Sequence, residues 1–224
     1  MNGKIIVNQQ RIYGEAFAKY GATPMGTYQN NPETQYLRYE RLIKNIKEYL
    51  HGDTIHDVGA GVCDLHKYLL ANKIDHEYSG TEIVQEMIEY SLREYPDIKL
   101  YNRNLLTVTN EIYDYAVLSG TLNLVNEIDK KVWKEYSYNI IRKMFAISSK
   151  GLAFNFLTTY NTFNKDDLMY FNPCEMFDYC ITNLSRFVLI DHNYPLYEAT
   201  ITVFKKEFLR SVYQGESFDK YFVN

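Results

Sequence analysis

The chain has 224 residues, of which 46% are hydrophobic and 23% charged, and its formal net charge is −4 at pH 7. These values exclude a disordered or fibrous protein and predict a globular one that buries a full core. Lysine and arginine are scattered along the chain, which argues against nucleic acid as a partner, because such binding neutralises many phosphates. No apolar run reaches the roughly 18 residues that a membrane helix needs. The three cysteines fit no zinc or disulfide spacing. We therefore expect a cytoplasmic protein whose partner is a small molecule, with no membrane or nucleic-acid partner; its oligomeric state stays open.

Residues 1–31 are predicted to form a helical cap or lid. A helical pattern runs from about Gln9 to Tyr20, and a cluster of turn residues at 21–26 follows it, as in a mobile flap. Asn31 is then suited to cap a helix, because it precedes a proline and a glutamate. Apolar residues repeat at helical spacing after it, which predicts an amphipathic helix over 32–50.

Beyond this helix, short β-rich runs alternate with helical patterns of about 10 to 15 residues. Such alternation is typical of βαβ units, which build a parallel sheet covered by helices on both faces. The predicted strands are 54–59, 77–82, 98–101, 113–119 and 152–156, and the predicted helices include 64–71, one that carries Val84 to Ser91 and one that carries Trp133 to Met144.

The C-terminal part has a different pattern. Two β-rich runs, 186–191 and 199–204, are separated by too few residues for a helical crossover, so they are expected to pair antiparallel. The predicted fold is a doubly wound α/β protein with a seven-stranded sheet, mostly parallel and ending in an antiparallel hairpin. We expect this domain to span 32–207 and a tail to span 208–224.

The run from Asp57 to Gly61 follows the first predicted parallel strand. In a doubly wound sheet, ligands bind at the carboxyl ends of the strands, and a glycine there lets the backbone approach the ligand. Gly59 and Gly61 therefore predict a ligand site. The alternative is a tight strand-to-helix turn without a ligand, and the two glycines favour neither.

Glu82 narrows the class of ligand. It stands at the predicted end of the second strand, where a carboxylate can accept both hydroxyls of a ribose. A dinucleotide fingerprint beginning at Gly59 would need glycine where Asp64 stands, and there is no Walker lysine. An acidic residue at the start of a helix repels pyrophosphate but tolerates a cationic ligand. S-adenosylmethionine, with its ribose, ammonium and sulfonium, fits these requirements.

At this point the chain resembles the class I S-adenosylmethionine-dependent methyltransferases, which have a Rossmann-like fold. Residues 56–61 resemble their first motif, residues 79–83 their ribose-binding strand end, and residues 113–120 their fourth strand. The chain departs from the family at Cys63, where many members have a third glycine, and we expect Cys63 to adopt ordinary helical angles. The cofactor contacts implied by these motifs are Asp57, Gly59, Ala60, Gly61, Glu82, Ile83 and Ser119.

The resemblance also implies contacts outside these motifs. Asn104 corresponds to a side chain that meets the adenine amino group, and Leu105 to a backbone N–H that meets the ring. Gln35 and Arg38 resemble a Gln-x-x-Arg-aromatic pattern of small bacterial methyltransferases, in which the arginine meets the cofactor carboxylate. The alternative for Gln35 and Arg38 is a surface pair with no ligand.

Three further segments, 151–157, 170–173 and 191–198, resemble a subgroup from bacterial surface-polysaccharide and secondary-metabolite clusters. Some members act on sugars and others on a capsular phosphoramidate. The implied reaction is methyl transfer to an oxygen of a sugar, nucleotide-sugar or phosphoryl group. Tyr194, in the last segment, is a predicted substrate contact.

Polar residues near the predicted strand ends are candidates for acceptor binding and catalysis. His192 is the histidine best placed to act as a general base for a hydroxyl nucleophile, although it also fits a solvated loop. Asn123 and Asn155 are predicted substrate contacts, with helix capping and loop hydrogen bonding as their respective alternatives.

The cap supplies two further candidates. Tyr13 and Tyr28 are predicted to close over the ligands, Tyr28 against the cofactor and Tyr13 against the substrate. Ordinary packing of the cap is the alternative. The other histidines have no ligand spacing, so no metal is expected. A nicotinamide-dependent oxidoreductase and a non-catalytic S-adenosylmethionine-binding domain remain alternative functions.

Overall fold

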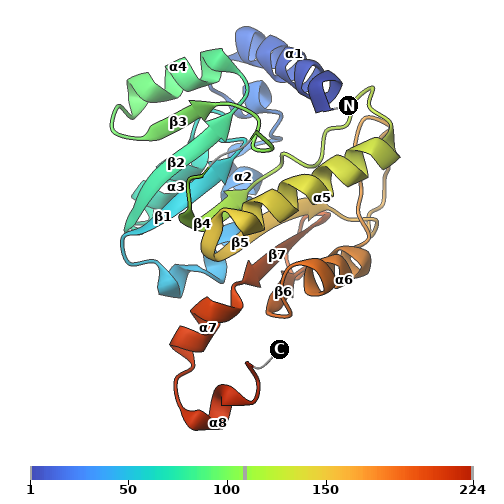
Figure 1. The fold of residues 1–224 in the computed structure, drawn as a ribbon. Coiled ribbons are helices and arrows are strands. Elements are labelled where there is room, and N and C mark those ends of the chain that lie inside the picture. The colour runs from blue at the N-terminus through green and yellow to red at the C-terminus, as the bar shows by residue number, and fades with distance from the viewer. Residues whose placement is uncertain (1, 108–109, 223–224) are drawn as a thin grey trace.

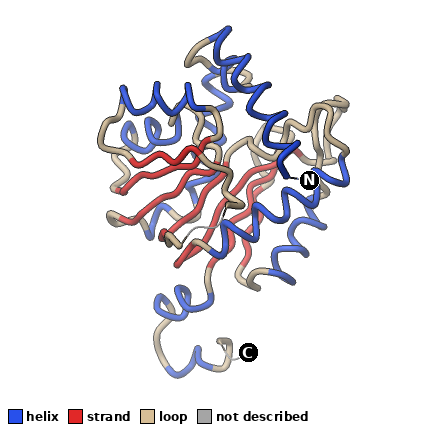
Figure 2. The backbone as a smooth tube through the Cα atoms, turned by 45° about the horizontal axis from the view of Figure 1, so that its top comes forward, coloured by secondary structure: helices blue, strands red, loops and turns tan. Residues whose placement is uncertain are grey.

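The computed structural model describes residues 2–107 and 110–222, which form one seven-stranded sheet with the order β3-β2-β1-β4-β5-β7-β6. All neighbouring strands are parallel except β5–β7 and β7–β6, which are antiparallel. Figure 2 shows the strands side by side with helices on both faces of the sheet. This confirms the doubly wound α/β fold with a C-terminal hairpin. The strands are β1 (Asp53–Val58), β2 (His76–Glu82), β3 (Lys99–Asn102), β4 (Tyr113–Leu118), β5 (Ser148–Leu157), β6 (Val188–Asp191) and β7 (Glu198–Phe204).

Two hydrophobic clusters lie on opposite faces of the sheet. One cluster contains buried residues of α2, α3 and α7, and the other contains buried residues of α5 and α6. Figure 1 shows α5 and α6 in front of the sheet and α2 and α3 behind it. The helices are α1 (Asn2–Tyr20), α2 (Pro32–Lys44), α3 (Asp64–Ala71), α4 (Gln85–Glu94), α5 (Lys130–Ala146), α6 (Pro173–Asn183), α7 (Lys206–Val212) and α8 (Glu216–Asp219).

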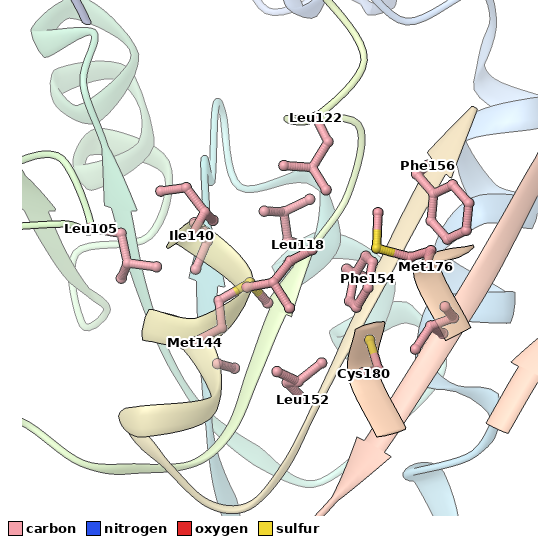
Figure 3. Close-up of a cluster of buried hydrophobic side chains, with 14 of the residues drawn as sticks. Leu105, Leu118, Leu122, Ile140, Met144, Leu152, Phe154, Phe156, Met176 and Cys180 are labelled. Atoms are coloured by element: carbon pink, nitrogen blue, oxygen red, sulfur yellow. The ribbon is translucent and has the colours of Figure 1, made fainter. Parts of the chain in front are cut away.

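The cluster beneath α5 and α6 is shown in Figure 3. Leu118 and Phe154, from the two central strands β4 and β5, are fully buried against Met144 of α5 and Met176 of α6. At about 25 cal/mol for each Å² of apolar surface removed from water, side chains of this size are a main source of stability. This cluster joins β4 and β5 to the helices above them, and the loop that follows β4 is hydrogen-bonded to the carboxyl end of β5 and lines the cavity described below.

The N-terminal helix α1 is longer and better packed than the sequence predicts. It begins at Asn2, and Ile5, Ile12 and Ala16 are buried. Phe17 packs against a small cluster that contains Met87 of α4. The expected flap is therefore a docked helix, because its apolar face is covered by the rest of the molecule. Whether residues 1–31, 32–207 and 208–224 act as separate units stays a prediction.

The helix predicted over 32–50 is shorter than expected. α2 ends at Lys44, and a separate 3₁₀ turn covers Lys47–Tyr49. Ile46 and Leu50 are still buried. The apolar spacing therefore predicted which residues are buried, but it wrongly predicted a continuous helix. No helix among the described residues is long and apolar enough to cross a membrane.

Candidate active site

A cavity lies where the strand order reverses, between the carboxyl ends of β1 and β4. Every predicted cofactor contact lines it, as do the predicted substrate contacts Tyr13 and Asn123. The structure thus brings together residues from α1, α2 and the ends of several strands. The predicted cofactor contacts in its wall are Tyr28, Gln35, Arg38, Asp57, Gly59, Ala60, Gly61, Glu82, Ile83, Asn104, Leu105 and Ser119.

The glycine turn after β1 has a conformation that only glycine adopts easily. Gly59 and Gly61 have φ angles of 74° and 55°, in the left-handed region. A Cβ at position 59 would lie 2.4 Å from Oγ1 of Thr121. That hydroxyl donates to the carbonyl of Val58 at 3.1 Å, which holds the loop after β4 against the end of β1. Gly59 is therefore required both by backbone conformation and by close packing.

Cys63 corrects one expectation. It has φ 60° and ψ 33°, a left-handed conformation, where ordinary helical angles were expected. The third position of the turn thus keeps the conformation that a glycine would adopt, although the residue is a buried cysteine. A left-handed backbone conformation is strained for a residue other than glycine, and Cys63 adopts it at this turn.

Glu82 is held by the backbone around it. One carboxylate oxygen accepts from the N–H of Gly61 at 2.8 Å, and the other accepts from Ile83 and Val84 at 2.7 and 2.9 Å. Burial raises the pKa of Glu82, and these three bonds oppose that shift. A carboxylate has about four acceptor positions, so one remains for a ribose hydroxyl while all three backbone bonds persist. The expected contact with both ribose hydroxyls would therefore require one of the backbone bonds to break.

Asp57 and Asp64 add two more carboxylates to the cavity wall. The hydroxyl of Tyr78 donates to Asp57 at 2.7 Å, and the amide of Gln35 donates to Asp64 at 2.9 Å. Burial raises the pKa of Asp57 to about 7 and also raises the pKa of Asp64. Within the described residues, none of the carboxylates of Asp57, Asp64 and Glu82 forms an ion pair. The cavity wall therefore suits a ligand with positive charge.

Arg38 has a different environment from the one predicted. Its guanidinium donates from Nε to both carboxylate oxygens of Glu198, at 2.8 and 3.0 Å, and from another nitrogen to Gln29 at 2.7 Å. Both members of the pair are buried, with 7% of Arg38 and 1% of Glu198 exposed. The positive charge of Arg38 is thus compensated inside the protein. The alternative that Gln35 and Arg38 form a surface pair is wrong, because both residues are buried. Glu198 lies 160 positions from Arg38, and Gln29 lies in the loop before α2. No local sequence pattern indicated that either residue contacts Arg38.

The wall near Asn104 combines a polar and an apolar part. Its Oδ1 accepts from the N–H of Leu106 at 3.1 Å and from the hydroxyl of Tyr136 at 3.4 Å. Trp133 and Tyr136, from α5, line the cavity beside it. The sequence predicted only that Trp133 and Tyr136 lie in one helix, and it indicated no role in ligand binding for either residue.

Helix α1 and the segment after it form the roof of the cavity. Tyr13 and Tyr28 meet edge to face, with ring centroids 5.2 Å apart. Burial and the nearby Glu82 raise the pKa of Tyr13. Gln9, which sequence analysis missed, also lines the cavity, and its amide donates to the carbonyl of Leu124 at 3.1 Å.

Three predicted residues lie outside the cavity wall. Asn155 is fully buried beneath it, and Tyr194 is buried with its hydroxyl 2.9 Å from that of Thr200. His192 is exposed and stacks on Tyr160 with a centroid distance of 6.0 Å. The expected placement of His192 over the cleft is therefore not observed, because the loop after β6 directs it toward an exposed tyrosine. The described residues contain no group of three potential metal ligands.

The chain is similar in sequence to a known protein. The chain is 32% identical over 155 residues to "Putative methyltransferase Rv1506c" of Mycobacterium tuberculosis, which covers 68% of this chain and 93% of the relative. No family model matches the chain.

Solved structures share the fold at low sequence identity. The DhpI–SAM–HEP complex has a TM-score of 0.63 at 13% identity and covers 88% of this chain and 96% of its own. Magnesium protoporphyrin IX methyltransferase from Synechocystis PCC 6803 with bound SAM has a TM-score of 0.58 at 12% identity, with the same coverage.

Proposed function

The chain belongs to the class I S-adenosylmethionine-dependent methyltransferase family, and we propose that it transfers a methyl group to an oxygen of a small-molecule acceptor. S-adenosylmethionine is the cofactor, and it supplies an electrophilic methyl group on a sulfonium. The observation that carries the proposal is the cavity, whose wall combines a glycine turn with three carboxylates that form no ion pair with any described residue.

The residues of the cavity fit the parts of this cofactor. Glu82 is suited to accept a ribose hydroxyl, and Asp57 and Asp64 are suited to face the ammonium group. Asn104 and the N–H of Leu105 are suited to the polar edge of adenine, with Tyr136 as an apolar neighbour. The chain itself then has to orient the acceptor and exclude water, because methyl transfer is an in-line displacement that depends on alignment.

The charges in the cavity favour a neutral hydroxyl among the proposed acceptors, which are a sugar, a nucleotide-sugar and a capsular phosphoramidate or phosphoryl group. Arg38 is paired with Glu198, and Arg103 is paired with Glu111 at 3.0 Å. Both arginines of the wall are therefore compensated, whereas an anionic oxygen next to Asp57 would be repelled. A sugar hydroxyl is the acceptor that this balance supports best. His192 is not retained as its base, because it lies outside the cavity.

Calorimetry with S-adenosylhomocysteine and NAD tests the proposal. We expect S-adenosylhomocysteine to bind and NAD not to bind. Glu82→Ala should weaken binding by about 1–3 kcal/mol, since it removes an acceptor of charge-assisted bonds. Glu86→Ala is the matched control, because Glu86 is exposed on α4 outside the cavity.

The outcomes separate the alternatives. Binding of NAD in place of S-adenosylhomocysteine would support the oxidoreductase. If S-adenosylhomocysteine binds, but S-adenosylmethionine is not converted to it with any sugar acceptor, the result would support the non-catalytic domain. An unchanged affinity in Glu82→Ala would remove Glu82 from the site.

A further inference from the structure

Asn155, on β5, lies beneath the cavity without lining it. Its Oδ1 accepts from the N–H of Gly120 at 2.8 Å, and its Nδ2 donates to Oγ of Ser119 at 3.1 Å. A backbone N–H can only donate, so the first bond fixes which way the amide points. Ser119 must then accept from Nδ2, and its own hydrogen is directed away from Asn155.

The next polar residue of the same loop is constrained in the same way. Oδ1 of Asn123 accepts from the N–H of Leu157, also on β5, at 3.1 Å. Its Nδ2 therefore points elsewhere, and within the described residues it has no protein partner. The bonds to β5 thus leave the hydroxyl hydrogen of Ser119 and the amide hydrogens of Asn123 without a partner among the described residues, and both side chains line the cavity.

Gln9 supplies the complementary acceptor from α1. Its Nε2 donates to the carbonyl of Leu124, which can only accept, so Oε1 is the atom left over. Gln9 lines the same cavity as Asn123, the neighbour of Leu124 in the chain. Among the described side chains of this part of the wall, the Ser119 hydroxyl and the Asn123 amide thus remain as donors, and Oε1 of Gln9 remains as an acceptor.

This set matches a neutral hydroxyl better than an amine. A hydroxyl oxygen has two lone pairs, so one can accept a hydrogen bond while the other attacks the methyl carbon. A neutral amine nitrogen has a single lone pair, and a donor that binds it blocks the attack. We propose that Ser119 and Asn123 hold the acceptor hydroxyl oxygen as donors and that Oε1 of Gln9 accepts a hydrogen bond from that hydroxyl. Asn155 is then a positioning residue that aims the Ser119 hydroxyl, and the Ser119 side chain serves the acceptor in place of the cofactor contact predicted from sequence.

This inference rests on the proposed function and specifies its acceptor. In the reaction, a lone pair of the hydroxyl oxygen forms the O–C bond as the C–S bond breaks. The electron pair of that bond stays on sulfur, which becomes a neutral thioether. The hydroxyl proton, which Gln9 holds by a hydrogen bond but is too weak a base to take, is released to solvent water, so charge and atoms balance.

A crystal structure with S-adenosylhomocysteine, at a resolution that shows ordered water, tests the inference without knowledge of the natural acceptor. We expect a water oxygen at the acceptor position, within hydrogen-bond distance of both Ser119 Oγ and Asn123 Nδ2. The inference is overturned if no oxygen bridges these atoms, or if Nδ2 of Asn123 binds a protein group. Failure of S-adenosylhomocysteine to bind would instead overturn the proposed function.

Variants test the positioning role of Asn155. In the Asn155→Asp variant with an ionised carboxylate, an oxygen replaces Nδ2 and accepts a hydrogen bond from the Ser119 hydroxyl. The hydrogen of Ser119 then points toward position 155 and away from the cavity. We expect the water bridge to lose its Ser119 contact. Asn155→Ala, which releases the Ser119 hydroxyl from Asn155, should weaken the same contact, and it keeps the test valid if Asn155→Asp does not fold. A contact between the water and Ser119 Oγ that persists unchanged in both variants contradicts the role.

Kinetics with a matched acceptor pair gives an independent measurement. Methyl α-D-glucopyranoside offers hydroxyls only, and its 2-amino-2-deoxy analogue adds an amine. If either compound is methylated, we expect the methyl group on an oxygen. With such an acceptor, each single variant should lose roughly 3- to 10-fold in rate, the effect of one hydrogen bond, and Ser119→Ala/Asn155→Asp should lose no more than Ser119→Ala. Methylation on nitrogen alone, or additive losses, overturns the inference; if neither compound reacts, the crystal structure decides.

Discussion

At Asp57, burial and ligand binding act in opposite directions. Removal from water raises its pKa to about 7, although the hydroxyl of Tyr78 donates to it and opposes the shift. Glu82 and Asp64, which face it from β2 and α3, raise the pKa further by their negative charge. Near neutral pH the free protein therefore holds Asp57 as a mixture of its charged and neutral forms, and a cationic ligand would favour the charged form.

This predicts a pH dependence of cofactor binding. Below pH 7, a ligand whose ammonium faces Asp57 has to displace a proton, so affinity for S-adenosylhomocysteine should rise with pH up to about 7 and then level off. The slope approaches a factor of about 10 for each pH unit well below the pKa. Calorimetry from pH 5.5 to 8 measures it. Asp57→Asn should be weaker and nearly flat over this range; a wild-type affinity that falls with rising pH would contradict the assignment.

Gly59 gives a second prediction for a single residue. Gly59→Ala places a Cβ against Thr121 and a side chain at a φ of 74°. The left-handed conformation costs an alanine about 1–2 kcal/mol, and the clash adds to this. Gly59→Ala/Thr121→Ala removes the clash and should recover only that part of the loss. Urea denaturation of both variants, with Gly3→Ala as a control that meets no neighbour, checks the expectation. Full recovery in the double variant would show that conformation plays no part.

The pair of Arg38 and Glu198 joins α2 to the first residue of β7, across 160 positions of sequence. Burial raises the pKa of Glu198, and the adjacent guanidinium opposes that shift. α2 also carries Gln35, which binds Asp64 in the cavity wall. The buried pair therefore fixes the position of an element that shapes the site.

Breaking this pair should be costly. Arg38→Met or Glu198→Gln alone leaves an uncompensated buried charge or donor, and each should cost about 3–5 kcal/mol of unfolding free energy. Arg38→Met/Glu198→Met should be more stable than the sum of its single changes predicts. Urea denaturation gives these values. The exposed pair of Lys134 and Glu175 is the control, because Glu175→Gln should cost at most about 1 kcal/mol. Additive losses at Arg38 and Glu198 would show that they act independently.

For the whole molecule, the position of α1 over the cavity determines how ligands enter. Tyr13 and Gln9 line the roof, and Tyr28, in the segment after α1, has a φ of 55°, in the left-handed region. A bound ligand would contact both the roof and the sheet edge. It would thereby stabilise α1 against local opening.

Hydrogen exchange measures this coupling. S-adenosylhomocysteine should slow amide exchange in α1 and in residues 24–29, because opening of the roof then costs the ligand contacts as well. Exchange in α7, which lies outside the cavity wall, should not change and serves as the control. Equal exchange in α1 with and without ligand would show that the roof makes no contact with it.

The order of elements followed from the sequence because each strand and helix has its own local periodicity. Apolar alternation, glycine turns and short connections act over a few residues, so they predicted the parallel strands, the antiparallel hairpin and the glycine turn of the site. The end of α2 was predicted less well, because buried Ile46 and Leu50 satisfy helical spacing without a continuous helix.

Contacts between distant segments depended on tertiary structure. Glu198 beside Arg38, Asn155 beneath Ser119 and Gln9 over the cavity become neighbours only when β5, β7 and α1 have packed. Likewise, a histidine at a strand end is equally compatible with a cleft and with solvent, and the loop after β6 placed His192 outside the cavity wall. Local patterns thus determined which elements form and which loops line the cavity, whereas packing decided which polar atoms of its wall have protein partners, since a hydrogen-bond partner is chosen by distance in space.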